Sequence, residues 1–299
     1  MVDVQLHRSI AEFGVIADRL YHRDPVMFTA ELTALKTASP SADNILLSVW
    51  VGTQLRGALV RTPPLALLTS GLPTLVAPDV ARVLAQAGYE IASIQGLTVN
   101  AVAFADAWRE VTGAHTTVEL EERLYRLGKF LAPPDVIGQA RLANRSDADL
   151  LTGWFDQFHG EAFGFVSDLD ARLSSLTHML ESGSQVLLWT LDDTPVSMAR
   201  LHPHIAAMSR IGPVFTPPTL RGQGYGSAGT AAAAQHALLT GAKHVVLFAD
   251  LANTVSNSIY QRIGFEPVAR TVEITVNRCQ GSGRPRGLAS ARRHPRDKN

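Results

Sequence analysis

Hydrophobic residues recur along the chain with two periods, and segments of each kind alternate in a regular order. Short apolar runs of strand length are separated by longer stretches in which apolar residues return every three to four positions, as in amphipathic helices. Strands are predicted at residues 45–51, 57–68, 90–97, 116–124, 138–142, 211–215 and 244–249, and helices within 9–38 and at 79–87, 101–111 and 227–239. The pattern predicts an α/β protein in which a similar order of elements occurs twice.

The predicted strand at 211–215 leads into the most distinctive segment of the chain. This segment, Arg221-Gly222-Gln223-Gly224-Tyr225-Gly226, is followed at once by an alanine-rich helix. Glycines at alternating positions let the backbone approach a ligand closely and point successive N–H groups in one direction. The helix adds its unpaired N-terminal N–H groups and the positive end of its dipole. The combination favours binding of a phosphate or pyrophosphate group.

Three kinds of loop bind phosphates in this way, and their spacing separates them. A Walker loop needs a lysine directly after its last glycine, and Gly226-Ser-Ala-Gly229 supplies none. A Rossmann loop has the spacing G-x-G-x-x-G, whereas the glycines here stand at 222, 224 and 226. The third pattern, Arg/Gln-x-x-Gly-x-Gly/Ala, is typical of acetyl-coenzyme A (acetyl-CoA) loops. Arg221, Gly224 and Gly226 match it.

A second motif follows the predicted strand at 244–249. It consists of Asn253, Ser256, Tyr260, Gly264 and Phe265. The order is an asparagine, a small residue three positions later, a tyrosine, and a Gly-Phe pair that ends the helix. Together, the two motifs resemble those of the GNAT superfamily of N-acetyltransferases, over about residues 141–276.

The resemblance implies an α/β (α+β) fold of tandem GNAT-like domains, each with a mixed, mostly antiparallel twisted sheet flanked by helices. The first half is expected to be degenerate, because Leu67–Val76 replaces the glycine loop with one glycine and one proline. Its helix at Asn100–Trp108 also lacks the tyrosine. We predict a degenerate GNAT-like domain at 1–130, a linker at 131–137, a catalytic GNAT domain at 138–277 and a disordered basic tail at 278–299.

The same resemblance implies roles for individual residues. Tyr260 would protonate the departing thiolate, since a phenol with a pKa of ~10 keeps its proton at pH 7. Asn253 and Asn257 would bind the coenzyme, and the backbone of Val214 and Phe215 would hold pantetheine and polarise the thioester. The pyrophosphate is expected against Arg221, Gly222, Gln223, Gly224, Tyr225, Gly226 and Ser227.

The general base that deprotonates the acceptor is not fixed by either motif. Glu161 is our first choice, because it lies where the family places a substrate-binding loop. His202, His204 and Asp250 stay open as alternatives. We expect no metal at His202-x-His204, because a third ligand at useful spacing is missing.

Composition limits the cellular setting. The chain has 299 residues, 46% of them hydrophobic, and a formal net charge of +0. Cys279 is the single cysteine, which excludes an internal disulfide and fits a reducing compartment. No apolar run approaches about 20 residues, and the N-terminus lacks a signal segment, so we expect a cytoplasmic protein without a membrane span. The tail at 278–299 has 7 basic residues and 1 acidic residue, but no interleaved aromatics that would favour a nucleic-acid partner.

These observations predict an N-acetyltransferase that moves an acetyl group from acetyl-CoA to a primary amine by direct attack in a ternary complex. The acceptor would be a small molecule or a peptide. The sequence leaves open whether the protein forms a homo-oligomer. The alternative is a non-catalytic sensor or scaffold that binds acyl-CoA. Tyr260 favours the enzyme, because a sensor needs no proton donor.

Overall fold

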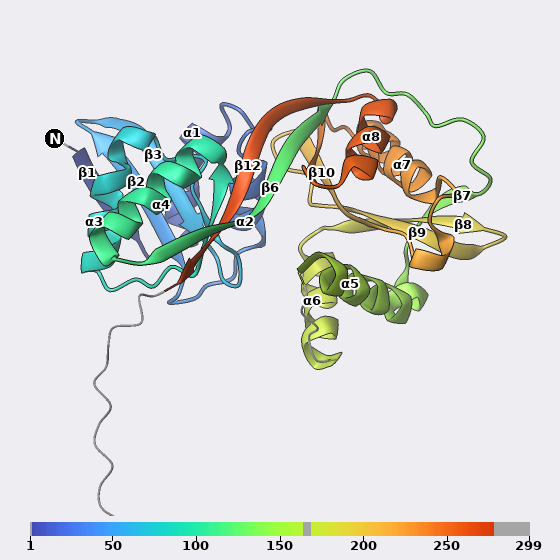
Figure 1. Cartoon of the computed structure of the whole chain (residues 1–299), viewed down its shortest axis with the longest axis horizontal. Helices are drawn as coiled ribbons and strands as arrows, with labels where there is room; N and C mark the ends of the chain where they lie inside the picture. Colours follow the sequence, from blue (N-terminus) through green and yellow to red (C-terminus); the bar gives the residue numbers. More distant parts are fainter. Residues whose placement is uncertain (1, 164–168, 278–299) are drawn as a thin grey trace, which may run out of the picture.

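The computed structural model describes residues 2–163 and 169–277. We call residues 2–127 the N-terminal half and 139–277 the C-terminal half. The N-terminal half contains β1 (Val2–His7), α1 (Ile10–Tyr21), α2 (Thr29–Thr37), β2 (Ile45–Val51), β3 (Gln54–Arg61), β4 (Leu67–Leu68), η1 (Thr74–Val76), α3 (Ala77–Gln86), β5 (Ser93–Leu97), α4 (Thr98–Thr112) and β6 (His115–Leu127). Helices flank its strands on both sides (Figure 1).

The C-terminal half repeats this order of elements. It contains β7 (Gln139–Leu142), η2 (Arg145–Asp147), α5 (Ala148–Phe163), α6 (Leu169–Glu181), β8 (Gln185–Leu191), β9 (Thr194–Leu201), β10 (Met208–Phe215), η3 (Pro218–Leu220), α7 (Tyr225–Leu239), β11 (His244–Asp250), α8 (Thr254–Ile263) and β12 (Phe265–Asn277). The fold is therefore the mixed α/β arrangement that the sequence pattern predicts.

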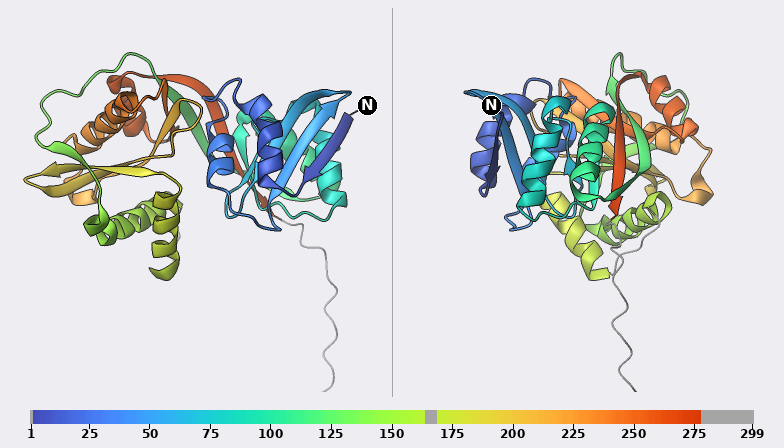
Figure 2. Two further views of the ribbon diagram at one scale, coloured as in Figure 1. Left: turned by 180° about the vertical axis from the view of Figure 1, so that it is seen from behind. Right: turned by 60° about the vertical axis from the view of Figure 1, so that its left-hand side comes forward.

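The two halves share one sheet and exchange their last strands. The 12-stranded sheet has the order β1-β2-β3-β4-β5-β12-β6-β11-β10-β9-β8-β7. The second part of β6 pairs with β11, from Arg126 opposite Val246 to Glu122 opposite Asp250. The second part of β12 pairs with β5 in return. Both strands are long and run side by side between the halves (Figure 2), so each half contributes a strand to the other.

Apolar residues on both faces of the sheet form separate cores. In the C-terminal half, α7 and α8 cover one face, which we call the first face, with Ile211, Val245 and Leu247 beneath them. Helices α5 and α6 pack on the opposite, second face over β8, β9 and the end of β10. Near the junction, Val26 of the N-terminal half packs against Met208 on that same second face. The second face of the C-terminal sheet thus borders both halves.

Several elements differ in detail from the sequence prediction. Helices α1 and α2 lie within the stretch 9–38 that was predicted to be helical, whereas the predicted strand 57–68 is divided into β3 and the two-residue β4. Helix α7 begins at Tyr225, two residues earlier than predicted, so Gly226 lies in its first turn. Asn144 caps the 3₁₀ turn η2 before α5, because its side chain accepts a hydrogen bond from the Ser146 N–H.

The domain boundaries at 1–130 and 138–277 stay a prediction. The tail at 278–299 and Cys279 lie outside the described residues. Within residues 2–163 and 169–277, none of the helices has the length and apolar character needed to cross a membrane.

Candidate active site

Strands β10 and β11 separate toward their ends and open a gap in the sheet. They pair in parallel from Met208 opposite His244 to Ile211 opposite Leu247, and the pairing stops there. A bulge between Ile211 and Val214 turns the rest of β10 away, while β11 continues to Asp250. The two strands are therefore splayed apart directly before the glycine loop.

The glycine loop closes one end of this gap and presents backbone N–H groups to it. Gly222 and Gly224 have φ angles of +82° and +84°, a conformation that other residues adopt at a cost. A Cβ at Gly222 would meet no atom within 4 Å, so open space lies beside this backbone. Gly224 is the N-cap of α7, and no side chain caps the helix there. The first N–H groups of α7 are thus available to an anion.

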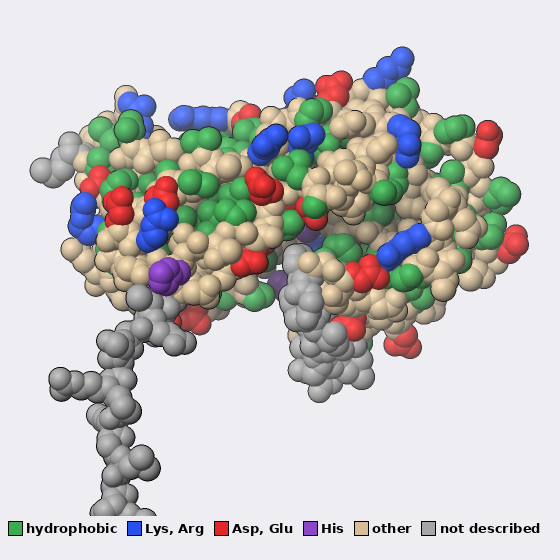
Figure 3. Space-filling view, in the orientation of Figure 1, with side chains coloured by type: hydrophobic (Ala, Val, Ile, Leu, Met, Phe, Trp, Pro, Cys, Tyr) green, Lys and Arg blue, Asp and Glu red, His purple; other side chains and the backbone are tan. Residues whose placement is uncertain are grey.

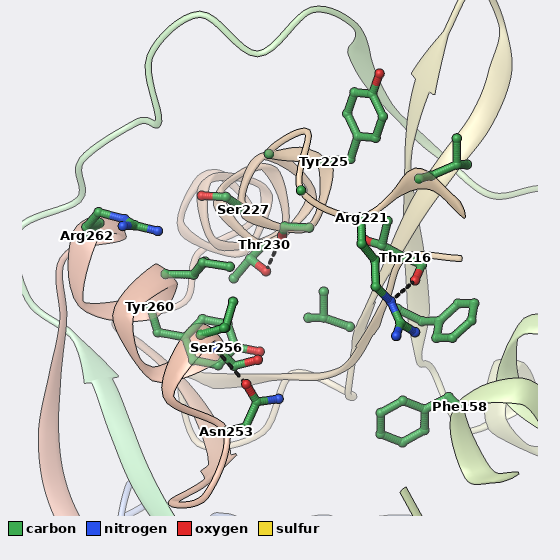
Figure 4. Close-up of a pocket in the computed structure, with 18 of the residues that line it drawn as sticks. Phe158, Thr216, Arg221, Tyr225, Ser227, Thr230, Asn253, Ser256, Tyr260 and Arg262 are labelled. Carbon is green, nitrogen blue, oxygen red and sulfur yellow. Dashed lines mark hydrogen bonds between the residues drawn. The ribbon is translucent and has the colours of Figure 1, made fainter. Parts of the chain in front are cut away.

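A pocket of about 640 Å³ lies between the loop and α8 (Figure 4). Eleven of the predicted site residues line it: Glu161, Val214, Phe215, Arg221, Gly222, Gly224, Tyr225, Gly226, Ser227, Asn253 and Tyr260. Gln223 and Asn257 are not among the lining residues. The two separate sequence motifs, around Arg221 and around Tyr260, therefore meet at one cavity.

Tyr260 stands in an environment that keeps its hydroxyl protonated. Its ring packs edge-on against the rings of Tyr125 and Phe265, with centroids 6.5 and 6.2 Å away. Burial raises the pKa of Tyr260 to about 12, although a hydrogen bond with Ser256 opposes the shift. The hydroxyl therefore carries its proton at neutral pH, which is the state that a proton donor needs at the start of the reaction.

The two predicted asparagines have different positions. Asn253 lines the pocket and caps α8, because its Oδ1 accepts a hydrogen bond of 3.0 Å from the Ser256 N–H (Figure 4). Asn257 faces the sheet instead. Its Oδ1 accepts from the Tyr125 hydroxyl at 2.7 Å, and its Nδ2 donates to the carbonyls of Asp250 and Asn253. The Asn257 amide thus ties α8 to β6 and β11, and the structure does not bring it to the pocket. Gln223 likewise accepts a hydrogen bond from the Tyr225 hydroxyl.

Arg221 and Glu161 form an ion pair at the loop end of the pocket. The Arg221 guanidinium lies 2.6 Å from a Glu161 carboxylate oxygen and donates at 2.9 Å to the Thr216 carbonyl. It also lies 5.8 Å from the centre of the Phe215 ring. Figure 4 shows Arg221 and Tyr260 on opposite sides of the pocket. Through its pairing with Arg221, Glu161 therefore lies at the end of the pocket where the pyrophosphate is expected.

The other candidates for the general base lie outside this pocket. His202 and His204 line a second hollow of about 290 Å³ with Ser209 and Thr240. Burial, then the charges of Arg210 and Arg200, lower the pKa of His202 well below its usual range, so it accepts a proton poorly near pH 7. Within the described part of the chain, no group of three or more His, Cys, Asp and Glu side chains could hold a metal ion.

Sequence reasoning missed several residues that line the pocket. Arg262 lies in the last turn of α8, on the side of the pocket away from Arg221 (Figure 4). Its position in the sequence, two residues after Tyr260 in the same predicted helix, could have marked it as a candidate for the pocket. Phe158 reaches the pocket from α5, and Thr216 follows β10 with its hydroxyl 2.9 Å from that of Ser197. Thr216 and Phe158 belong to neither motif, so only the fold reveals them.

Comparison with known proteins agrees with this geometry. Residues 148–265 match the model of the acetyltransferase (GNAT) family. The chain has no significant sequence match among the curated proteins.

Several solved structures resemble the whole chain. A GCN5-related N-acetyltransferase from Sphaerobacter thermophilus has a TM-score of 0.62 at 14% identity, covering 93% of this chain and 96% of that chain. An acetyltransferase of the GNAT family from Colwellia psychrerythraea has a TM-score of 0.60 at 11% identity, covering 92% and 100%. A tandem GNAT protein from the clavulanic acid biosynthesis pathway has a TM-score of 0.59 at 13% identity, covering 93% and 98%.

Residues 148–265 therefore form a domain of the GNAT type, and the whole chain has the tandem GNAT fold with a GNAT-like N-terminal half. The family supports acetyl transfer in general, with acetyl-CoA as its usual donor.

Proposed function

We propose that the protein transfers an acetyl group from acetyl-CoA to a primary amine of a small molecule or peptide. The observation that carries the proposal is the meeting of the open glycine loop and the protonated Tyr260 at one cavity. The N–H groups at the start of α7 and the side chain of Arg221 would hold the pyrophosphate. Backbone groups of Val214 and Phe215, at the gap between β10 and β11, would bind pantetheine and polarise the thioester carbonyl.

The reaction would run by direct attack. The neutral amine adds to the thioester carbon, the C–N bond forms, and the tetrahedral adduct collapses with loss of the C–S bond. Tyr260 gives its proton to the departing sulfur and regains one from the new amide nitrogen as that nitrogen sheds its extra proton. Coenzyme A and the acetylated amine leave, and one proton of the original ammonium passes to solvent through a base.

A binding experiment with a matched control tests the coenzyme site. In Gly222→Asp, a carboxylate occupies the open space where the pyrophosphate would lie, and we expect calorimetric binding of acetyl-CoA to be lost. Gly88→Asp is the control, because Gly88 has a similar φ of +77° and equally open surroundings in the N-terminal half. It carries the same backbone strain and the same added charge, so binding should be retained.

Thiol release separates the enzyme from a coenzyme-binding sensor. Wild-type protein with acetyl-CoA and a library of primary amines should release free coenzyme A, and Gly222→Asp should release none above background. Tight binding without thiol release for any amine would favour the sensor instead. A folded wild-type protein that does not bind acetyl-CoA would refute the proposal.

A further inference from the structure

The gap between β10 and β11 opens to both faces of the sheet. Val214 and Tyr260 reach the coenzyme pocket from the first face, whereas Phe158 on α5 and Phe215 reach it from the second. An acetyl group held at the gap is therefore accessible from the second face. The two halves border a hollow in the surface, with basic and histidine side chains in its depth (Figure 3).

Charged side chains gather on the second face beside the end of β11. Side chains alternate between faces along a strand, and Leu124, Met208 and Val246 form a small core on this side. Glu122 is two residues from Leu124 and Arg210 two from Met208, so both side chains share this face. The Arg210 guanidinium lies 5.7 Å from the centre of the Phe248 ring, which places Arg210 next to the open end of β11.

Glu122 reaches this place because of the strand exchange. It belongs to β6 of the N-terminal half, yet its register partner is Asp250, the last residue of β11. Asp250 lies three residues before Asn253 of the coenzyme pocket, and its carboxylate accepts a hydrogen bond of 2.8 Å from the Ala252 N–H. Glu122 thus stands one strand away from the edge of the gap, on the side opposite the coenzyme helices.

The surroundings of Glu122 give it the proton affinity of a base that works near neutrality. Burial first, then the negative charges of Glu273 on β12 and Asp250 on β11, raise the pKa of Glu122 to about 7. The positive charge of Arg210 on β10 and a hydrogen bond with Gln95 on β5 act in the opposite direction. Efficient general bases have pKa values close to the working pH.

Among the residues that the structure describes, the lining of the coenzyme pocket supplies no comparable group. The one carboxylate in that described lining, Glu161, is paired with Arg221 at the pyrophosphate end. His202 is not a comparable base either, because its ring contacts Arg210: a guanidinium nitrogen lies 3.2 Å from the His202 Nδ1. An acceptor ammonium that enters through the second face would instead meet Glu122 and Asp250.

We propose that the acceptor amine approaches the acetyl group from the second face and that Glu122, supplied by the N-terminal half, is its general base. The inference rests on the proposed acetyl transfer. The Glu122 carboxylate takes one proton from the ammonium, directly or through one water, and becomes a carboxylic acid. The freed lone pair forms the C–N bond, and Glu122 returns its proton to solvent after the product leaves.

The test compares wild-type protein with Glu122→Gln, which keeps the size of the side chain and removes the base. With an alkylamine acceptor that the wild type accepts, kcat/KM should fall by about 10²- to 10³-fold at pH 7. The wild-type profile of log kcat/KM against pH should bend near pH 7, with the lower rate on the acid side, and this bend should vanish in Glu122→Gln. Calorimetric binding of acetyl-CoA should not change.

Two comparisons separate a catalytic role from a structural one. An alkoxyamine acceptor is already neutral at pH 7 and needs no base, so Glu122→Gln should slow its acetylation far less than that of the alkylamine. Glu273→Gln removes a neighbouring negative charge and keeps Glu122. Its bend should therefore move to lower pH with little loss of the maximal rate.

The outcomes distinguish the two proposals. A Glu122→Gln variant that binds acetyl-CoA and retains both the alkylamine rate and the bend would refute the role of Glu122 and leave acetyl transfer intact. An equal loss for both acceptors would also refute it, since the defect would then lie in structure. Wild-type protein without acetyl transfer to any amine would overturn the proposed function, and the role of Glu122 with it.

Discussion

The N-terminus of α7 and the N-terminus of α3 occupy equivalent places in the two halves but have opposite packing. Each follows a strand and a 3₁₀ turn, η3 before α7 and η1 before α3. Beside α7, a Cβ on Gly222 would meet only open space. Before α3, a Cβ on Gly71 would lie 2.6 Å from the Ala58 carbonyl oxygen and 2.7 Å from the Tyr21 ring. Open space therefore lies beside Gly222, whereas Gly71 packs against the protein's own backbone and the Tyr21 ring.

The helices opposite the N-termini of α7 and α3, namely α8 and α4, also differ in whether they face a pocket or the core. Helix α8 presents the hydroxyl of Tyr260 to a pocket, whereas α4 buries the rings of Phe104 and Trp108 in the core. The proline at the start of α3, Pro78, also removes one of the N–H groups that an anion would need. The two halves thus share a fold but differ in the open loop backbone and the polar opposing helix, which are the features that the proposed coenzyme site needs.

The largest expected effect concerns the tyrosine that one half has and the other lacks. Tyr260→Phe should lower kcat by about 10²- to 10⁴-fold, because the thiolate would lose its proton donor. The Kd for acetyl-CoA should stay within about twofold, as measured by calorimetry. Trp108→Phe, at the related place in α4, should lower the melting temperature and leave kcat unchanged. A Tyr260→Phe enzyme with normal kcat would contradict the assignment of the acid.

The second prediction concerns the difference between the packed glycine before α3, Gly71, and the open glycine loop before α7. Gly71→Ala should destabilise the protein by about 1–3 kcal/mol in urea unfolding, because the added methyl group overlaps backbone and ring atoms. The affinity for acetyl-CoA of the remaining folded protein should not change. An unaltered unfolding midpoint would show that the N-terminal loop is less tightly packed than the structure indicates.

The third prediction concerns stability against pH at the junction of the halves. The folded pKa of Glu122, about 7, is raised above the usual value of a glutamate, so the protonated form favours folding. Its contribution is fully present below the unfolded pKa of about 4.5 and is lost as the pH rises through about 7. Glu122→Gln should therefore be more stable than wild type at pH 8, by an amount on the order of 1–3 kcal/mol, and should lose this advantage below pH 4.5. Equal stability of both proteins at pH 8 would show that burial and the neighbouring carboxylates do not disfavour the charged form of Glu122.

The smallest expected effects concern the ion pair at the loop. Arg221→Gln should weaken acetyl-CoA binding by about 3- to 30-fold, since one charged contact with the pyrophosphate is lost. Glu161→Gln should strengthen binding slightly, because it removes a negative charge next to the phosphates and frees Arg221. Calorimetry at two salt concentrations checks both variants. Weaker binding in Glu161→Gln would indicate that Glu161 positions Arg221 rather than competes for it.

The sequence predicted the local elements of the fold well but not how the halves are joined. The strand at 45–51 and the loop-to-helix transition near Gly224 follow from local patterns, namely apolar runs and glycine spacing. The exchange of β6 and β12 does not follow from local patterns, because the residue pattern of a strand does not determine which other strand it pairs with. The predicted strand 116–124 stopped short of Tyr125–Leu127, the residues that help β6 to reach into the C-terminal half.

The same limit applies to the site. Motif spacing pointed to Arg221, Gly224 and Tyr260, and all three line one pocket in the structure. Spacing suffices here because each of these residues has a fixed place in its own loop or helix. Asn257 was expected to face the coenzyme, but its helical phase turns it toward Tyr125, a residue 132 positions away along the chain. Glu122 has an unremarkable sequence context, and only the register with Asp250 places it near the gap.

We propose that the chain has one coenzyme site, at the N-terminus of α7, and that the N-terminal half has none. Calorimetric titration of the full chain with acetyl-CoA tests it directly, because the same experiment gives the affinity and the number of sites. We predict one molecule bound per chain, with no binding to Gly222→Asp. Two molecules per chain, or a single site that survives in Gly222→Asp, would contradict the account.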